Sequence, residues 1–304
     1  MKHKLIIILV LLGMFIVTQF IGLYVVKHYS QNELPYGMEP PELSEKEKTQ
    51  FFPSIIIAFI IAIALFFLLT KFKVEFVLKL WFFAVVSLAI GLAFYAIFTN
   101  KLFFEKLIFE NIPIIATLIA IPLAFIKIYK RNLIVHNATE LLIYPGIAAV
   151  FIPLLNIWTM IILLILISVY DAWAVWHSGI MQKMAKYQIN TLKIFSGFFI
   201  PYVSKKQRQM IKYLKNNSKK SELKKKKIKI NIAILGGGDV VFPIISAGVM
   251  LKTLGIWPAI FVILGAVLGL SYLLFFSEKK KFYPAMPFIT AGIFLGMIVS
   301  VLVF

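Results

Sequence analysis

Residues 230–250 read INIAILGGGDVVFPIISAGVM, an apolar run whose one charged residue is Asp239. A second aspartate, Asp171, is the one carboxylate in the apolar run 157–177. A carboxylate at bilayer depth costs about 2.5 to 3.5 kcal/mol on insertion scales, so such a residue indicates a functional site and needs a partner. Each aspartate is the obvious partner of the other, and we expect the chemistry of the chain at this pair.

The composition is that of a membrane protein. Hydrophobic residues make up 61% of the 304 positions, whereas soluble domains have about 45 to 50%. The chain has no cysteine, which excludes disulfides, thiolate nucleophiles and cysteine-ligated metals. We predict an all-α, multi-pass integral membrane protein.

Apolar runs of roughly 18 residues or more are long enough to cross the hydrocarbon core of a bilayer. Nine such runs are predicted as spans: 5–26, 53–70, 74–99, 111–129, 133–154, 157–177, 229–250, 256–276 and 282–303. Lysine and arginine accumulate in cytoplasmic loops. The lysine-rich stretch 205–227 is therefore expected in the cytoplasm and the acidic stretch 27–52 outside. The N-terminus then lies inside and the C-terminus outside.

These spans divide the chain into three predicted parts. Residues 1–177 form a six-helix bundle, 178–228 a basic cytoplasmic loop, and 229–304 a three-helix part. Much of the net charge of +19 lies in the loop. Lysines beside a membrane helix favour anionic lipid headgroups, so we expect lipid rather than nucleic acid as the loop's partner. The apolar stretch 187–202 is predicted to lie in the membrane interface as a helix.

Three short motifs accompany the aspartates. They are Tyr170-Asp171, then Leu235-Gly236-Gly237-Gly238-Asp239, and finally Pro284-Ala285-Met286. In this order, on these spans, they resemble the presenilin and signal peptide peptidase family of intramembrane aspartic proteases, whose patterns are Tyr-Asp, Gly-x-Gly-Asp and Pro-Ala-Leu. The resemblance implies a nine-helix presenilin-like fold. Met286 stands where the family has leucine, a change of similar volume.

The resemblance also implies residue roles. Asp171 and Asp239 would be catalytic. Tyr170 and the residues Leu235, Gly236, Gly237 and Gly238 would support them, and the loop of Pro284, Ala285 and Met286 would help to receive substrate. No metal or cofactor is implied.

Two carboxylates facing each other in low dielectric do not both ionise easily, so one holds a proton while the other acts as a base. Such a pair activates water without a metal ion. Three consecutive glycines in a helix are costly, at roughly 1 kcal/mol each, and predict close backbone approach or a local break. Free backbone groups at residues 234–239 would then pair with an extended substrate strand.

The predicted function is an intramembrane aspartic endopeptidase. Its expected substrates are transmembrane helices of single-span proteins, or remnant signal peptides, with the N-terminus outside. We expect it in a prokaryotic cell membrane, with a homo-oligomer as one possible assembly. Two alternatives remain: a proton-coupled transporter, in which the aspartates relay protons, and a prepilin-type peptidase, which shares the Gly-x-Gly-Asp element.

Other polar residues are assigned ordinary roles. Glu140 is predicted to be a first-turn charge at a helix N-terminus. His136 and His177 lack the spacing of zinc ligands.

Overall fold

The computed structural model describes residues 5–38, 41, 43–71, 75–99, 108–109, 112–130, 132–178, 196–202, 231–277 and 283–303. These residues form nine α-helices, as predicted. The helices are α1 (Leu5–Tyr29), α2 (Glu45–Lys71), α3 (Glu75–Phe98), α4 (Ile114–Phe125), α5 (Leu133–Phe151), α6 (Ile157–Trp173), α10 (Gly237–Leu254), α11 (Ile256–Phe276) and α12 (Met286–Val303). Over the residues that the structure describes, seven helices are long and apolar enough to cross a membrane: α1, α3, α5, α6, α10, α11 and α12.

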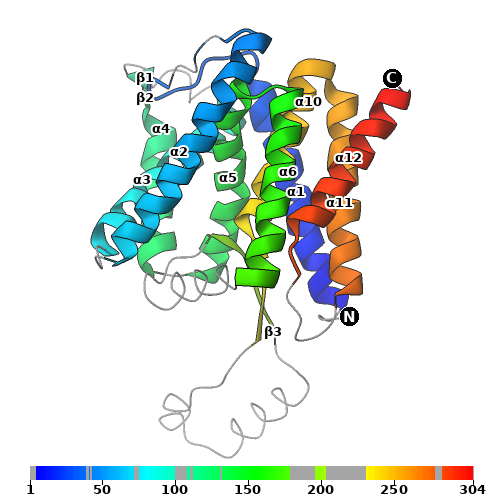
Figure 1. Cartoon of the computed structure of the whole chain (residues 1–304). Coiled ribbons are helices and arrows are strands. Elements are labelled where there is room, and N and C mark those ends of the chain that lie inside the picture. The colour runs from blue at the N-terminus through cyan, green and yellow to red at the C-terminus, as the bar shows by residue number, and fades with distance from the viewer. Residues whose placement is uncertain are drawn as a thin grey trace, which may run out of the picture.

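The helices stand side by side in one bundle, with the N- and C-terminal ends at opposite ends of it (Figure 1). Helix α1 packs against α5, α10, α11 and α3, so the first helix contacts both halves of the chain. The start of α1 lies at the same end of the bundle as the strand β3 (Gly197–Tyr202). This arrangement agrees with the prediction that the N-terminus and the connection between α6 and α10 share one side of the membrane.

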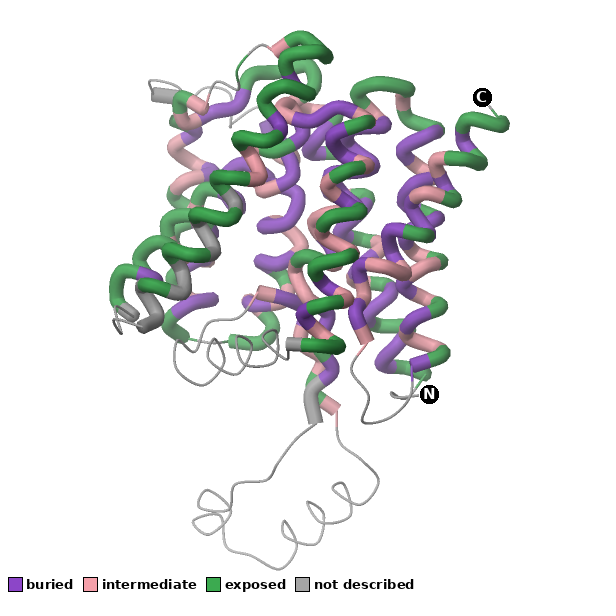
Figure 2. Tube along the Cα trace, in the orientation of Figure 1, coloured by how far each residue is buried: buried purple, intermediate pink, exposed green. Residues whose placement is uncertain are grey.

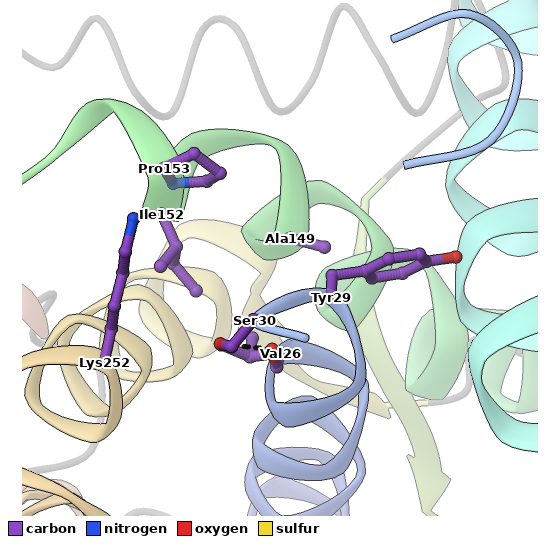
Figure 3. Close-up of a pocket in the computed structure, with 7 residues that line it drawn as sticks. All are labelled: Val26, Tyr29, Ser30, Ala149, Ile152, Pro153 and Lys252. Atoms are coloured by element: carbon purple, nitrogen blue, oxygen red, sulfur yellow. Dashed lines mark hydrogen bonds between the residues drawn. The ribbon is translucent and has the colours of Figure 1, made fainter. Parts of the chain in front are cut away.

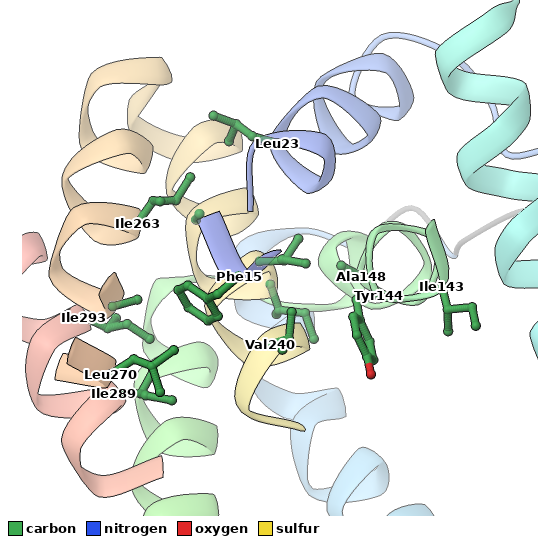
Figure 4. Close-up of a cluster of buried hydrophobic side chains, with 14 of the residues drawn as sticks. Phe15, Leu23, Ile143, Tyr144, Ala148, Val240, Ile263, Leu270, Ile289 and Ile293 are labelled. Carbon is green, nitrogen blue, oxygen red and sulfur yellow. The ribbon is translucent and has the colours of Figure 1, made fainter. Parts of the chain in front are cut away.

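Apolar side chains from α1, α5, α10, α11 and α12 form the core. Phe15, Tyr144 and Val240 are fully buried within it (Figure 4). The outward faces of the helices are also apolar, and many of their large side chains are exposed (Figure 2). An apolar exterior of this kind matches lipid as the surrounding solvent.

Helices α11 and α12 approach each other closely through facing glycines. A Cβ placed on Gly265 would collide with the backbone of Gly292, and one on Gly292 with the backbone of Gly265. Gly269 and Gly296 meet the partner helix's backbone in the same way. Each helix thus carries a Gly-x-x-x-Gly pair, the small-residue pattern that allows membrane helices to pack tightly. This contact fixes α12, whose first residue is Met286.

Two small antiparallel sheets add to the helices. Strand β1 (Ile108–Phe109) pairs with β2 (Ile112–Pro113), and β3 pairs with β4 (Asn231–Gly236). The predicted start of the seventh span at residue 229 is therefore wrong, because residues 231–236 are a strand and the helix begins at Gly237. Alternating β-branched residues favour the strand, and a glycine before an acidic first turn favours the helix start.

The predicted interfacial helix over 187–202 is wrong for its last six residues, which form β3. Its earlier part, and nearly all of the basic loop, lie outside the described residues.

Candidate active site

Asp171 is held at the junction of α6 and α12. Helix α6 begins at a capping box in which Asn156 and Thr159 satisfy each other's backbone N–H groups. Asp171 lies near its other end, 4% exposed, and its Oδ2 accepts a hydrogen bond of 3.0 Å from the backbone N–H of Met286. One turn earlier, Ser168 donates to the hydroxyl of Thr290 at 2.8 Å. These two bonds join α6 to the first turns of α12.

Asp239 is the third residue of α10, and Gly236 is the N-cap of that helix. The carboxyl group of Asp239 folds back over Gly236, where a Cβ would lie 3.1 Å from Oδ2. The backbone of Gly236 donates a hydrogen bond to this carboxyl group. An acidic residue at the third helical position that bonds to the N-cap backbone is half of a capping box. Asp239 therefore lies in the first turn of α10, because this helix begins at Gly237 and not at the predicted residue 229.

The two aspartates share one environment. They lie within electrostatic reach of each other, and α6 and α10 are in contact. Each carboxylate sits at a helix N-terminus, Asp239 at its own helix and Asp171 at α12. The N-terminal end of a helix dipole favours negative charge. The arrangement thus offers two carboxyl groups with backbone donors already aimed at them.

The three glycines differ in how tightly they are packed. A Cβ on Gly237 would lie 2.7 Å from Oγ of Ser196 and 2.9 Å from the ring of Tyr144. A Cβ on Gly238 would meet only Phe242, at 3.7 Å. The predicted close approach therefore falls on Gly236 and Gly237, while Gly238 is exposed.

The remaining predicted site residues lie at different distances from the pair. Leu235 is buried in the core and Pro284 is buried beside Met286. Ala285 is half-buried and directly precedes α12. Tyr170 is 43% exposed and its ring faces Trp173. The structure thus brings Gly236 and Met286 to the carboxyl groups and leaves Tyr170 on an exposed face of α6.

A buried polar cluster was not predicted. Lys127, at the end of α4 in a π-helical turn (Ile126–Lys130), pairs with Glu140 of α5 at 2.5 Å. Glu140 is fully buried, so its prediction as a first-turn helix charge is wrong. The N-cap of α5 is Asn132, which leaves Glu140 beyond the first turn. The aspartates were identified as charged residues within apolar spans. The same criterion applies to Lys127 and Glu140 and identifies them too.

A cavity at the opposite end of α10 from Asp239 is drawn in Figure 3. It has a volume of about 150 Å³ and is lined by Val26, Tyr29, Ser30, Ala149, Ile152, Pro153 and Lys252. Lys252 follows Asp239 by thirteen residues, roughly 20 Å along α10 at 1.5 Å per residue. Among the described residues no group of three His, Cys, Asp or Glu side chains is arranged to hold a metal ion.

Two solved structures share this fold. Both are described as a presenilin family intramembrane aspartate protease, one in space group C222 and one in P2. The first is 16% identical, with a TM-score of 0.60, and the alignment covers 98% of this chain and 99% of that one. The second is 17% identical with a TM-score of 0.60, covering 97% of each chain. The sequence has no match among curated proteins.

The helical bundle, taken with a family model that matches almost the whole chain, defines an intramembrane aspartyl protease. The family model described as signal-peptide peptidase, presenilin aspartyl protease matches residues 7–304. The chain belongs to this family, and it is a multi-pass membrane hydrolase, as the motifs predicted.

Proposed function

We propose that the protein is an endopeptidase that hydrolyses peptide bonds of single-span membrane proteins, or of remnant signal peptides, within the bilayer, with Asp171 and Asp239 as its catalytic pair. The observation that carries the proposal is the shared environment of the two carboxyl groups, each bonded to a backbone N–H at a helix N-terminus. Family membership supports a protease over the proton-coupled transporter and the prepilin-type peptidase.

The chemistry follows from sharing one proton between two acids. The ionised carboxylate removes a proton from a water molecule while the protonated partner donates its proton to the substrate carbonyl oxygen. The water oxygen bonds to the carbonyl carbon and gives a neutral tetrahedral diol. The carboxyl group that took the water proton donates it to the leaving nitrogen, and the C–N bond breaks. The other carboxylate takes a proton from a hydroxyl of the diol, which becomes the carboxylic acid product, so the pair again holds one proton. Neither a metal nor a covalent intermediate enters these steps.

An edge of the β3–β4 sheet is the proposed place for the substrate backbone. In an antiparallel pair, residues alternate between facing the partner strand and facing away. The N–H and C=O of Phe199 bond to the side-chain amide of Asn137, at 3.0 and 2.8 Å, so Phe199 faces away from β4. Its partner in the register is Ile234. The N–H and C=O of Ile234 therefore face outward on the other side of the sheet.

This outer edge of β4 leads directly to Asp239. Pro201, which pairs with Ile232, fits the same alternation, because a proline lacks the N–H that a partner-facing position needs. On the β3 side, Asn137 already occupies the edge. A substrate segment that unwinds from its helix can add to β4 as a third strand, with its backbone held at Ile234 and its next residues at the aspartates.

The expected orientation of the chain gives the direction of the substrate. With the basic loop in the cytoplasm, a substrate whose N-terminus is outside reaches the site from the membrane. Three further expectations stay predictions: binding of anionic lipids by the basic loop, location in a prokaryotic cell membrane, and assembly into homo-oligomers.

Cleavage of a defined substrate tests the proposal. Purified protein in detergent, incubated with a model peptide that carries one apolar helical segment, should yield two fragments whose masses place the cut within that segment. Intact peptide after long incubation, in several detergents and in liposomes, would contradict an endopeptidase. Proton-coupled uptake of a solute into those liposomes without a cut would favour the transporter.

A further inference from the structure

The buried cluster beside the site joins two charges and a histidine to one backbone position. Lys127, His136 and Glu140 are all buried, with Glu140 at 0% exposure. The ammonium of Lys127 lies 2.5 Å from Oε1 of Glu140 and 3.3 Å from Nδ1 of His136. Charges buried in a membrane protein are costly and mark function more often than scaffolding. This cluster has no part in the proposed hydrolysis itself.

The cluster holds both polar groups of the Gly197 backbone. Oε1 of Glu140 accepts from the N–H of Gly197 at 3.2 Å. Lysine has donors only, so Nδ1 of His136 is the acceptor in its contact with Lys127, and Nε2 carries the proton. That N–H donates to the C=O of Gly197 at 2.8 Å. Gly197 has φ +146°, a backbone conformation that favours glycine.

Gly197 lies directly opposite Gly236 in the sheet. Gly236 is the residue whose backbone bonds to Asp239 and over which that carboxyl group folds. A path of direct contacts therefore runs from Glu140 through Gly197 and Gly236 to Asp239.

Tyr144, one turn after Glu140, supports the same junction. Its ring packs edge-on against Phe198 of β3, with centroids 5.7 Å apart. A Cβ on Gly237 would lie 3.0 Å from its hydroxyl. Helix α5 thus contacts the start of β3 and the start of α10 together.

We propose that Lys127, His136 and Glu140 are positioning residues that fix β3 at Gly197 and thereby set the place of Gly236 and Asp239 for cleavage. The ion pair with Lys127 orients Glu140 toward Gly197, and His136 holds the carbonyl of the same residue. The proposal rests on the proposed function, since it concerns the position of one of the two catalytic carboxyl groups.

Two neutral double variants isolate the bond to Gly197. In one, Lys127→Met is combined with Glu140→Gln, and in the other with Glu140→Leu. Both remove the two charges together, which in buried ion pairs is often neutral for stability. Glutamine keeps an oxygen that accepts from the Gly197 N–H, whereas leucine does not. The measurements are kcat and KM for the model peptide, thermal unfolding, and amide hydrogen exchange of residues 196–202.

The leucine variant is expected to have a kcat at least about tenfold below that of the glutamine variant, because it lacks the hydrogen bond to the Gly197 N–H that holds β3 in place. Its KM is expected to stay within about threefold of that of the glutamine variant. Its residues 196–202 should exchange faster, while unfolding temperatures stay similar. Equal kcat values in the two variants, or equal exchange over 196–202, would overturn the proposal. If the unmodified protein itself cleaves no peptide, the proposed function fails instead. The exchange comparison still tests whether the side chain at position 140 holds the backbone of Gly197 in place.

Discussion

The backbone N–H of Met286 bonds to the carboxylate of Asp171 at 3.0 Å, across 115 positions of sequence. This bond gives a physical reason why the motif Pro284-Ala285-Met286 accompanies the two aspartates. It ties the first residue of α12 to a carboxyl group of α6, and Ser168 and Thr290 reinforce the contact one turn away. The identity of the side chain at position 286 matters less to this bond than its N–H.

Replacing Met286 tests that bond. Met286→Pro removes the N–H at the first position of α12, where proline fits a helix well. Since hydrogen bonds to charged groups contribute about 1.5 to 3 kcal/mol, cleavage should fall about 10- to 150-fold. Met286→Leu keeps the N–H and a similar volume, so its rate should stay within about threefold. Steady-state cleavage of the model peptide measures both, and equal rates for the two variants would contradict the assignment.

The glycines of the second motif should respond differently to alanine. Gly237→Ala brings a methyl group against Tyr144 and Ser196, and overpacking of this kind costs about 1 to 3 kcal/mol. Gly238→Ala has room beside Phe242 and gains about 0.5 to 1 kcal/mol of helix propensity. Thermal unfolding in detergent should show a lower midpoint for the first and an unchanged or higher midpoint for the second. The reverse order would show that α10 begins elsewhere.

The glycine contact between α11 and α12 should be needed for the position of Met286. Gly292→Ala forces apart two helix backbones that touch at Gly265, at a cost of about 1 to 3 kcal/mol. Both the unfolding midpoint and the cleavage rate should fall. Gly13→Ala in α1 is the matched control, because a Cβ there meets nothing within 4 Å. If Gly13→Ala lowers the unfolding midpoint and the cleavage rate by the same amounts, the contact between α11 and α12 is not the cause of the effect.

The outer edge of β4 is tested at Ile234. Ile234→Pro removes an N–H that faces away from β3, so the sheet should survive. The substrate loses one backbone hydrogen bond, which contributes roughly 1 kcal/mol or slightly more to binding. The value of kcat/KM should therefore fall by about tenfold. Ile234→Ala keeps the N–H and removes only the side chain, so it separates the two contributions. If both variants lose activity equally, the side chain and not strand addition binds the substrate.

The sequence indicates the two aspartates as candidate site residues because each is the one carboxylate in a long apolar run. It also predicted nine helices, each from an apolar segment, and seven of them are long and apolar enough to cross a membrane over their described residues. The sheet was missed because β4 pairs with a distant segment, and a six-residue strand before Gly237 reads as part of the apolar run. Pairing of Lys127 with Glu140 depends on how the end of α4 packs on α5. Packing of this kind leaves no periodic pattern in the sequence from which the pairing can be predicted.

The glycine run shows the same limit in finer detail. Three glycines indicated a local break, yet the position of that break depends on which of them meets a neighbour. Tyr144 and Ser196 come from segments outside the motif, and they make Gly237 tight while Gly238 stays open.

The most direct test of the two-aspartate account is cleavage by Asp171→Asn and Asp239→Asn in the full-length protein. Asparagine keeps the size and an acceptor oxygen but carries no exchangeable acidic proton, so each variant should lose about 100- to 10,000-fold in rate, the range of general acid–base catalysis. Unfolding midpoints near that of the unmodified protein would show that the fold is kept. A folded variant of either residue that still cuts the peptide at close to the unmodified rate would contradict the account.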